Sequence, residues 1–375
     1  MPMHTVNRRN WLRLVGLAGT GVAFAPLANA QSVQGPDFPA RPQLPGGPVR
    51  LSSNENPYGP SSKVREAMIK AFDDACRYPF SYTKDLTRMI AEKEGVNPEY
   101  IVLTAGSTEG LKVTGLSFGM HGGEIVAADP TFQSLMTYGE QFGAHIHWVP
   151  LDSTLTHDLE AMEKRVNNNT RLVFVCNPNN PTGTLLPAEK MRDFCRSMAG
   201  RAIVFADEAY FDYVTEPGYP SMVELVKQDF NVIVSRTFSK VFGLAGIRAG
   251  YLIARPDIAR RLAANCMANL NMLAISAAKA AMEDQEFYRF SLQKNEAAKK
   301  YLYNLLDEMK LRYIPSHANF VFFETRRDIS TFMADMARHQ VIVGRPFPPL
   351  NQWCRISTGT MAEMEAFGQA LRKVV

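Results

Sequence analysis

The sequence lacks any strong excess of one charge. Its 375 residues include 41 Lys or Arg and 37 Asp or Glu. Three of the basic residues lie within residues 1–30, where there is no acidic residue, so the rest of the chain is almost neutral. Proteins that bind nucleic acids rely on clustered positive charge to neutralise phosphates. The charge balance therefore predicts no nucleic-acid partner.

Cysteine is scarce and carries no recognisable pattern. The five cysteines stand at positions 76, 176, 195, 266 and 354, with no CxxC pair and no Cys/His spacing typical of metal ligands. An odd number also argues against a complete set of disulfides. We therefore predict buried thiols and no metal site.

No apolar run is long enough to cross a membrane, which takes about 20 residues. The apolar run over residues 14–25 follows the paired Arg8 and Arg9, and residues 28–30 (Ala-Asn-Ala) resemble a signal-peptidase site. Together they resemble a bacterial twin-arginine signal, with an ordinary secretory signal as the alternative. We predict an exported, periplasmic protein without a membrane segment in its mature form.

Short apolar runs alternate with longer amphipathic stretches from about residue 100 onward. Such runs are typical of buried strands, and helices between most of them favour a mostly parallel sheet with helices on both faces. The expected strands are Ile101–Leu103, Glu124–Ala127, Leu172–Val175, Ala202–Phe205 and Val232–Val234. The sequence thus predicts an α/β fold.

The two ends of the chain differ from this pattern. Residues 31–50 are rich in Pro, Gly and Gln, and a helix is expected to begin near Ser61. Residues 282–310 predict a long helix whose polar residues, Lys299 among them, are solvated. We predict an export signal, an N-terminal arm with part of a small domain, a large domain, and a linking helix with a small α+β domain, over residues 1–30, 31–75, 76–270 and 271–375.

Four local patterns carry the candidate chemistry. The first, residues 104–110 (Thr-Ala-Gly-Ser-Thr-Glu-Gly), follows an expected strand and opens a helix. A turn of this kind presents free N–H groups and hydroxyls to an anion such as phosphate. Because small-residue turns are common, this pattern alone is weak evidence.

The second pattern is Asn-Pro-Asn-Asn-Pro-Thr-Gly at residues 177–183, again after an expected strand. Its prolines and glycine restrict the loop and hold Asn180 rigidly as a hydrogen-bond donor. A simple turn would explain the same residues equally well.

The third pattern is Asp207-Glu208-Ala209-Tyr210, directly after the expected strand Ala202–Phe205. The carboxyl end of a buried parallel strand is where open α/β sheets bind ligands. A buried carboxylate there needs a cation, which a protonated pyridine nitrogen supplies. The alternative is that Asp207 caps the next helix.

The fourth pattern places Lys240 behind Thr237 and Ser239 and ahead of Arg248. A lysine forms a Schiff base only as the neutral amine, which nearby positive charge and partial desolvation favour. The two hydroxyls and the arginine suit a phosphate. A lone lysine in such a context is usually a surface residue, so the order of all four patterns carries the argument.

The four patterns in this order resemble the class I/II pyridoxal-phosphate aminotransferases, and within them the histidinol-phosphate aminotransferase-like group. The resemblance runs from about residue 50 to the C-terminus. It rests on the segments Asn54–Pro60, Arg77–Pro79, Asn177–Gly183, Asp207–Tyr210, Ser239–Lys240 and Gly243–Arg248. These motifs are specific to the superfamily and not to one substrate. They imply an aspartate-aminotransferase-like fold (fold type I) and pyridoxal 5'-phosphate as cofactor.

The resemblance assigns the catalytic residues. Lys240 is implied to hold the cofactor through a Schiff base and then to act as the base that moves the proton. Asp207 is implied to pair with the pyridine nitrogen, and Asn180 and Tyr210 to hydrogen-bond the ring oxygen.

It also assigns the rest of the cofactor site. Phe132 stands where the family places an aromatic ring against the cofactor, although most such residues are core. Tyr78 matches a tyrosine given to the neighbouring subunit, which implies a homodimer. The implied phosphate site consists of Gly106, Ser107, Thr108, Thr237, Ser239 and Arg248.

Three residues are implied on the substrate side. Arg355 matches the arginine that grips the substrate's carboxylate or equivalent anion as a bidentate fork. Arg345 is a second cation nearby in sequence, with a surface role as the alternative, and Asn54 belongs to the first matching motif.

The implied reaction is the exchange of an amino group between an amino acid and a 2-oxo acid. Three alternatives stay open: a lyase, decarboxylase or oxidase with the same cofactor, histidinol-phosphate aminotransferase itself, and a non-catalytic protein that binds an amino acid or the cofactor. The histidinol-phosphate enzymes usually have a tyrosine in their N-terminal segment, whereas residues 31–50 contain none.

The export signal makes a direct prediction. We expect cleavage after Ala30, because the small residues at positions 28 and 30 fit the signal-peptidase pocket. N-terminal sequencing of the protein secreted by a bacterial host should begin at Gln31. A mature protein that retains Met1 would contradict the prediction.

Overall fold

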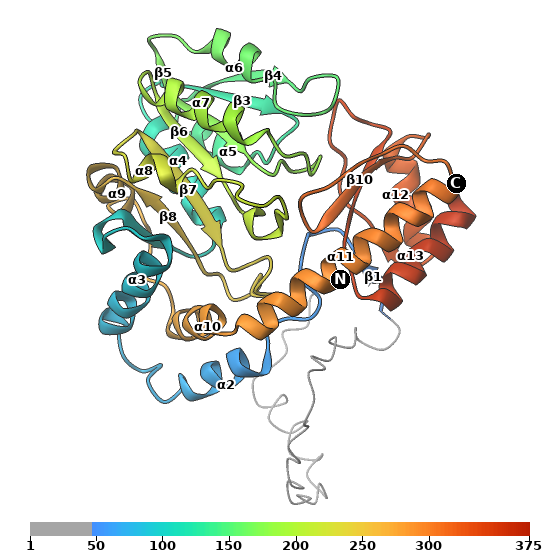
Figure 1. Ribbon diagram of the computed structural model, residues 1–375, viewed down its shortest axis with the longest axis horizontal. Coiled ribbons are helices and arrows are strands. Elements are labelled where there is room, and N and C mark those ends of the chain that lie inside the picture. Colours follow the sequence, from blue (N-terminus) through green and yellow to red (C-terminus); the bar gives the residue numbers. More distant parts are fainter. Residues whose placement is uncertain (1–46) are drawn as a thin grey trace, which may run out of the picture. The chain divides into compact units, whose positions relative to one another are not determined.

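The computed structural model of the chain describes residues 47–375 (Figure 1). The expected export signal, with its cleavage site after Ala30, and the arm up to residue 46 lie outside the described residues. No helix in the described region has the length and apolar character needed to span a membrane.

The central sheet of the described region has seven strands in the order β2-β8-β7-β6-β5-β3-β4. Strand β8 runs antiparallel to both neighbours, and the other neighbouring pairs are parallel. The mostly parallel sheet is therefore confirmed. Its strands are β2 (Ile101–Thr104), β3 (Glu124–Asp129), β4 (His145–Pro150), β5 (Thr170–Cys176), β6 (Ile203–Asp207), β7 (Val232–Thr237) and β8 (Gly250–Ala254).

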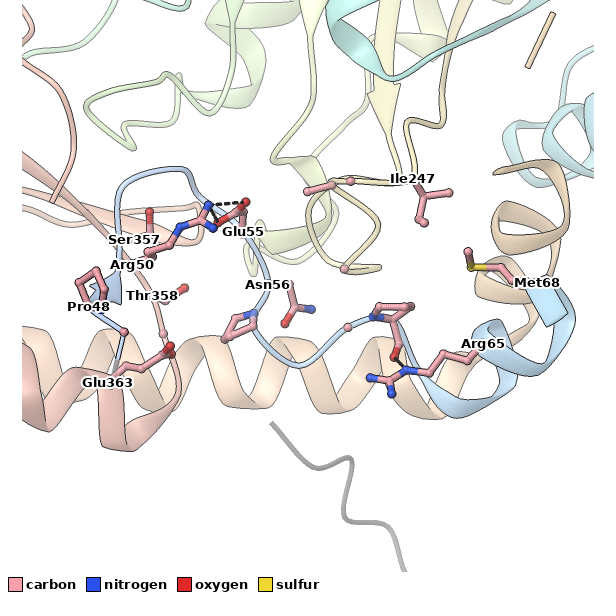
Figure 2. Close-up of a pocket in the computed structure, with 18 of the residues that line it drawn as sticks. Pro48, Arg50, Glu55, Asn56, Arg65, Met68, Ile247, Ser357, Thr358 and Glu363 are labelled. Atoms are coloured by element: carbon pink, nitrogen blue, oxygen red, sulfur yellow. Dashed lines mark hydrogen bonds and ion pairs between the residues drawn. The ribbon is translucent and has the colours of Figure 1, made fainter. Parts of the chain in front are cut away.

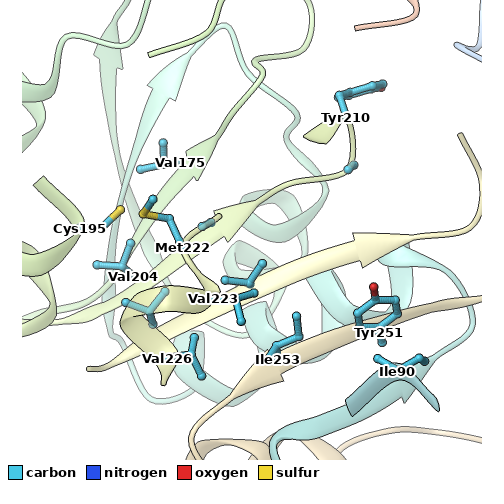
Figure 3. Packing of buried hydrophobic residues seen from close by; sticks show 14 of the residues in the cluster. Ile90, Val175, Cys195, Val204, Tyr210, Met222, Val223, Val226, Tyr251 and Ile253 are labelled. Atoms are coloured by element: carbon cyan, nitrogen blue, oxygen red, sulfur yellow. The ribbon is translucent and has the colours of Figure 1, made fainter. Parts of the chain in front are cut away.

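Helices cover both faces of this sheet. Successive strand residues point to opposite faces, so each strand contributes to two core clusters. In β6, Val204 and Ala206 belong to one core cluster and Phe205 to the other. The first cluster (Figure 3) includes residues of α2 (Ser62–Lys70), α3 (Phe80–Glu94), α6 (Leu159–Arg165), α7 (Ala188–Ala199), α8 (Val223–Val226) and α10 (Met272–Glu283). The second includes residues of α4 (Ser107–Gly119), α5 (Ser134–Gln141) and α9 (Pro256–Ala263). The short 3-10 helices η1 (Pro98–Tyr100) and η2 (Phe211–Tyr213) lie in the connections.

The C-terminal part forms a smaller region with its own core. Strands β10 and β12 pair in an antiparallel sheet with β9, and β11 pairs in parallel with β1, the first described strand. Long helix α11 runs from the large region into this one (Figure 1). The elements are β1 (Val49–Arg50), α11 (Gln285–Glu308), β9 (Tyr313–Ile314), β10 (Phe320–Glu324), α12 (Ile329–Arg338), β11 (Val341–Ile342), β12 (Trp353–Ser357) and α13 (Met361–Val374).

The structure confirms the predicted start of a helix near Ser61 and contradicts the predicted solvation of Lys299. Helix α2 begins at Ser62, and the Ser61 side chain caps it by accepting a hydrogen bond from the Val64 N–H. The expected solvation of Lys299 is wrong: the residue is buried, and its Nζ donates to the Ser316 carbonyl at 2.9 Å. All five cysteines are unpaired. Cys176, Cys195 and Cys354 are buried as predicted, whereas Cys266 is only partly buried and Cys76 is exposed, so the prediction of buried thiols is wrong for Cys76. The exact limits of the expected domains stay a prediction.

Candidate functional site

A cavity of about 540 Å³ lies beyond the carboxyl end of β6, between the large region and the C-terminal region. This is the position at which open α/β sheets bind ligands, and the volume suits a cofactor with its substrate. Its lining includes Ser52, Ser53, Asn54, Glu55, Ser107, Thr108, Phe132, Asn180, Asp207, Tyr210, Ser239, Lys240, Arg248, Met333, Val343, Arg345 and Arg355. Most residues expected from the motifs therefore surround one space.

Asp207 is the last residue of β6 and lies at the floor of the cavity. It is buried, and its Oδ1 accepts a hydrogen bond from the Ala209 N–H at 3.2 Å. Burial raises the pKa of Asp207 to about 7, because no solvent stabilises the charged form. Among residues 47–375 no cation forms an ion pair with it, so the carboxylate suits a positively charged ligand.

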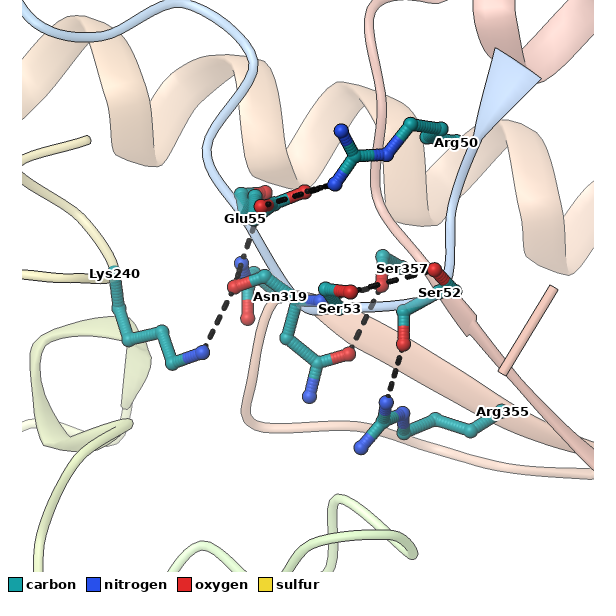
Figure 4. Close-up of polar contacts among 9 residues, drawn as sticks. Arg50, Ser52, Ser53, Glu55, Lys240, Asn319, Arg355 and Ser357 are labelled. Carbon is teal, nitrogen blue, oxygen red and sulfur yellow. Dashed lines mark hydrogen bonds and ion pairs between the residues drawn. The ribbon is translucent and has the colours of Figure 1, made fainter. Parts of the chain in front are cut away.

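Lys240 lies after β7 and points its amine into the same cavity (Figure 4). Its Nζ donates to the Asn54 carbonyl at 3.0 Å and lies 5.3 Å from the centre of the Tyr210 ring. Burial, assisted by the positive charge of Arg355, lowers the pKa of Lys240 to about 8. A neutral amine is the form that attacks a carbonyl carbon.

One end of the cavity is built to receive an anion. Gly106 caps α4 with a φ of 78°, a left-handed conformation that glycine adopts without strain. A side chain at Gly106 would collide with the guanidinium of Arg248. Arg248 donates to the Ala105 carbonyl at 3.1 Å and to the Ser239 hydroxyl at 3.4 Å, and Thr237 donates to Ser239 at 2.9 Å.

The helix start adds to this anion site. Helix α4 begins at Ser107, and Ser107 and Thr108 line the cavity. The first N–H groups of a helix have no partners within the helix and carry partial positive charge. Arg248, the hydroxyls and the start of α4 therefore form a site with the shape and charge for a phosphate.

Asn54 connects the two regions of the structure at the cavity. Its Nδ2 donates to the Tyr210 hydroxyl at 2.9 Å, and its Oδ1 accepts from the Ser357 hydroxyl at 2.9 Å. Asn319 Nδ2 donates to the Asn54 carbonyl at 3.1 Å, the same oxygen that holds Lys240. Asn54 itself has a φ of 53°, in the left-handed region. These contacts fix Asn54 in a conformation that few non-glycine residues adopt.

Arg355 reaches the cavity from β12 in the C-terminal region. Its two terminal nitrogens donate to Asn180 Oδ1 and to the Ser52 carbonyl, both at 2.6 Å. Figure 4 shows the contact with Ser52. Its guanidinium lies 5.2 Å from the centre of the Phe347 ring. No carboxylate within the described residues forms an ion pair with Arg355, so its charge is available to an anionic ligand.

Arg345 and Phe132 also lie at the cavity. Arg345 is exposed at the cavity, its guanidinium lies 4.4 Å from the centre of the Phe347 ring, and it donates to the Pro346 carbonyl at 3.1 Å. Desolvation lowers the pKa of Arg345. Phe132 packs on the second core cluster and borders the cavity. Arg345 therefore adds a second positive charge beside that of Arg355.

Tyr78 does not reach the cavity of its own chain. Its side chain is 80% exposed and stacks on Phe80, with the ring centres 5.6 Å apart. The structure therefore brings together the expected site residues with the exception of Tyr78, whose predicted role would require a second subunit.

Sequence reasoning missed several lining residues. Ser52, Ser53, Met333 and Val343 line the cavity but belong to none of the motifs that predict the site. Within residues 47–375 no group of three or more His, Cys, Asp and Glu is arranged to hold a metal ion.

The described residues fit pyridoxal phosphate. The unpaired buried carboxylate of Asp207 suits a protonated ring nitrogen, and the cradle around Gly106 and Arg248 suits a phosphate. Lys240, with its lowered pKa, lines the same cavity. These three features match the charge distribution of that cofactor.

Comparison with known proteins leads to the same family. The family "Aminotransferase class I and II" matches residues 47–371. A histidinol-phosphate aminotransferase from Moorella thermoacetica is 37% identical, over 89% of this chain and 91% of its own length. Histidinol-phosphate aminotransferase 2 from Methylococcus capsulatus is also 37% identical, over 87% and 90%.

Solved structures agree on the fold. The histidinol-phosphate aminotransferase from Sinorhizobium meliloti, in complex with pyridoxal-5'-phosphate, superposes with a TM-score of 0.80 at 27% identity and covers 87% of this chain and 91% of its own. An aspartate aminotransferase from Thermotoga maritima has a TM-score of 0.78 at 19% identity, over 87% and 91%, and shows the fold alone. The aspartate-aminotransferase-like fold is thus confirmed, and the chain belongs to the class I and II aminotransferases, the pyridoxal-phosphate-dependent enzymes that exchange amino groups between amino acids and 2-oxo acids.

Proposed function

We propose that this aminotransferase acts on an amino compound with two negative charges, such as a phosphate monoester or a second carboxylate. The observation that carries the proposal is the pair of arginines at one cavity, Arg355 and Arg345, neither of which forms an ion pair with a carboxylate of the described residues. A guanidinium fork matches carboxylate and phosphate oxygens, and the burial of Arg355 strengthens its contact.

Histidinol phosphate and L-glutamate both fit this description. The relatives named as histidinol-phosphate aminotransferases support the first. The second carries one carboxylate for Arg355 and another for Arg345. Product analysis with and without an added 2-oxo acid separates transamination from a lyase, decarboxylase or oxidase reaction.

The roles proposed for the residues follow from their positions. Asp207 would hold the ring nitrogen of the cofactor, Asn180 and Tyr210 its ring oxygen, and Phe132 one ring face. The phosphate would bind at Gly106, Ser107, Thr108, Thr237, Ser239 and Arg248. Bound there, pyridoxal phosphate supplies an aldehyde that condenses with amines and a ring that accepts electrons from the bond being broken.

Lys240 carries the proton in this scheme. Its neutral amine would take a proton from the substrate carbon next to nitrogen and would hold it inside the cavity for return in the next step, because Lys240 lines that cavity. The Asn54 carbonyl holds the amine within reach between these steps. Arg355 and Asn54 meanwhile orient the substrate so that the correct bond faces Lys240.

We further propose a homodimer that completes the site with Tyr78. Apolar side chains close to it in sequence are exposed, with Ile69 at 67%, Phe72 at 62% and Phe80 at 63%. Ile69 and Phe72 also line a groove of about 760 Å³ that includes Arg50, Glu55, Asn56, Arg65 and Met68 (Figure 2). Exposed apolar surface of this kind is typical of an interface.

The export of the enzyme through a twin-arginine route remains a proposal from residues 1–30 alone. Folding before export would let the chain take up its cofactor in the cytoplasm.

Lys240→Ala tests the central role. The variant should lose the visible absorbance of the bound cofactor's imine and all measurable turnover, because no other lysine of residues 47–375 lines the cavity. Lys279→Ala, on α10 and outside the cavity, is the matched control. A Lys240→Ala protein that keeps both properties would remove the assignment.

The lowered pKa of Lys240 makes a pH prediction. Below about pH 8 the amine is increasingly protonated, so the rate of cofactor capture by the cofactor-free enzyme should fall about tenfold per pH unit. Above that pH the rate should level off, because the amine is already neutral. Stopped-flow absorbance between pH 6 and 10 measures this, and a rate without pH dependence would contradict the role of the amine.

Arg345→Gln tests the second anion contact. The KM for substrates with two negative charges should rise up to about fivefold, since an ion pair at an exposed arginine contributes about 0.2–1 kcal/mol. The KM for L-alanine should change little. Bleaching of the cofactor band by histidinol phosphate, L-glutamate and L-alanine gives the comparison. Arg338→Gln, an exposed arginine on α12, is the control, and equal effects on all three substrates would refute the proposal.

A further inference from the structure

A buried ion pair lies directly behind the catalytic floor and has no role in the site described above. Arg236 Nη2 and Glu208 Oε2 are 2.8 Å apart, and their side chains are only 8% and 4% exposed. Neither residue lines the cavity that holds Asp207 and Lys240. Retaining two charges in a protein interior requires a compensating arrangement, because their desolvation is costly.

The pair is joined to the site through the backbone. Glu208 directly follows Asp207 at the end of β6, and the Glu208 N–H donates to the Ser235 carbonyl of β7 at 3.1 Å. Arg236 is the next residue of β7, four positions before Lys240. Because successive residues point to opposite faces, Asp207 faces the cavity while Glu208 faces away from it.

The contacts of the pair fix it in one geometry. Glu208 accepts hydrogen bonds from the Ser221 hydroxyl at 2.8 Å and from the Met222 N–H at 2.7 Å. Arg236 also donates to Ser221 at 3.0 Å, and its guanidinium lies 4.1 Å from the centre of the Phe211 ring. The pair therefore ties the chain after β6, the segment around residue 221 and β7 into one unit.

Other charged groups surround the pair. Glu94 of α3, Asp212 of η2 and Tyr251 of β8 act on Arg236 together with Glu208, and the Tyr251 hydroxyl donates to Glu94 at 2.7 Å. Burial opposes the charge of Arg236, but Glu208 and these neighbours raise its pKa, so the guanidinium stays charged. The negative charge of Glu208 in turn is among the groups that raise the pKa of Asp207.

We propose that Glu208 and Arg236 form a positioning pair, which fixes the carboxylate of Asp207 relative to Lys240. The opposite charges of the two residues cancel each other at the site. Intact, the pair adds rigidity but almost no net charge beneath the cofactor. With one partner neutralised, the remaining charge acts through the protein interior on both Asp207 and Lys240. The inference rests on the roles proposed for these two residues.

Glu208→Gln in the cofactor-loaded enzyme gives the test. The amide keeps the shape of Glu208 but removes the carboxylate nearest to Arg236, and the positive charge gained on balance disfavours the protonated imine at Lys240. The pH midpoint of the visible absorbance change should therefore fall by about half a unit to one unit. Spectrophotometric titration measures the midpoint without reference to turnover.

The double variant Glu208→Gln/Arg236→Met removes both charges, and its midpoint should return to within about 0.2 units of the wild type. Glu224→Gln on α8, which breaks the partly exposed pair with Arg192 of α7, is the control and should leave the midpoint unchanged. A merely structural pair would lower thermal stability in the single and double variants without moving the midpoint, and that result overturns the proposal. So does a double variant shifted as far as the single one.

The results of these titrations distinguish a failure of the proposed pair from a failure of the roles assigned to Lys240 and Asp207. A wild-type enzyme without a cofactor band would refute the roles of Lys240 and Asp207. A normal wild-type band with an unshifted Glu208→Gln band refutes only the charge-balanced pair. Should Glu208→Gln bind no cofactor, the double variant decides: a normal midpoint supports the proposal and a shifted one overturns it.

Discussion

The site depends on one carboxylate, Asp207, which the fold buries at the end of the central strand β6. A charge in that position is costly unless a cation meets it, and no cation of residues 47–375 forms an ion pair with it. The need for a cationic partner explains why the cavity above it suits a protonated ring. The other features, from the anion cradle at α4 to the two arginines, are arranged around the ring that this carboxylate would hold.

Much of the large region could be predicted because its signals are local. Five strands of the central sheet are short apolar runs, and the motif residues stand at the ends of strands or the start of α4. Strand β4 was missed because His145 and His147 interrupt its apolar pattern at the edge of the sheet. Strand β8 was missed because it follows the lysine motif without a separating helix.

The contacts made by the C-terminal region could not be read from the sequence. Ser357 lies 303 positions from Asn54, and Asn319 lies 265 positions from it, yet both hydrogen-bond to that residue. No spacing of neighbouring residues in the sequence predicts these hydrogen bonds, because they form only after both regions have folded. Lys299 was misjudged for the same reason: its partner, the Ser316 carbonyl, is supplied by the loop that follows α11 and β9.

The hydrogen bonds of Asn54 have a consequence for how the protein matures. The carbonyl that holds the reactive lysine belongs to the first described segment, and the groups that fix this carbonyl come from the last quarter of the chain. A nascent chain that has finished only its large region would present Lys240 without this support. Binding of the coloured cofactor would therefore report that the segment at Asn54 has formed its contacts with Asn319 and Ser357 of the C-terminal region.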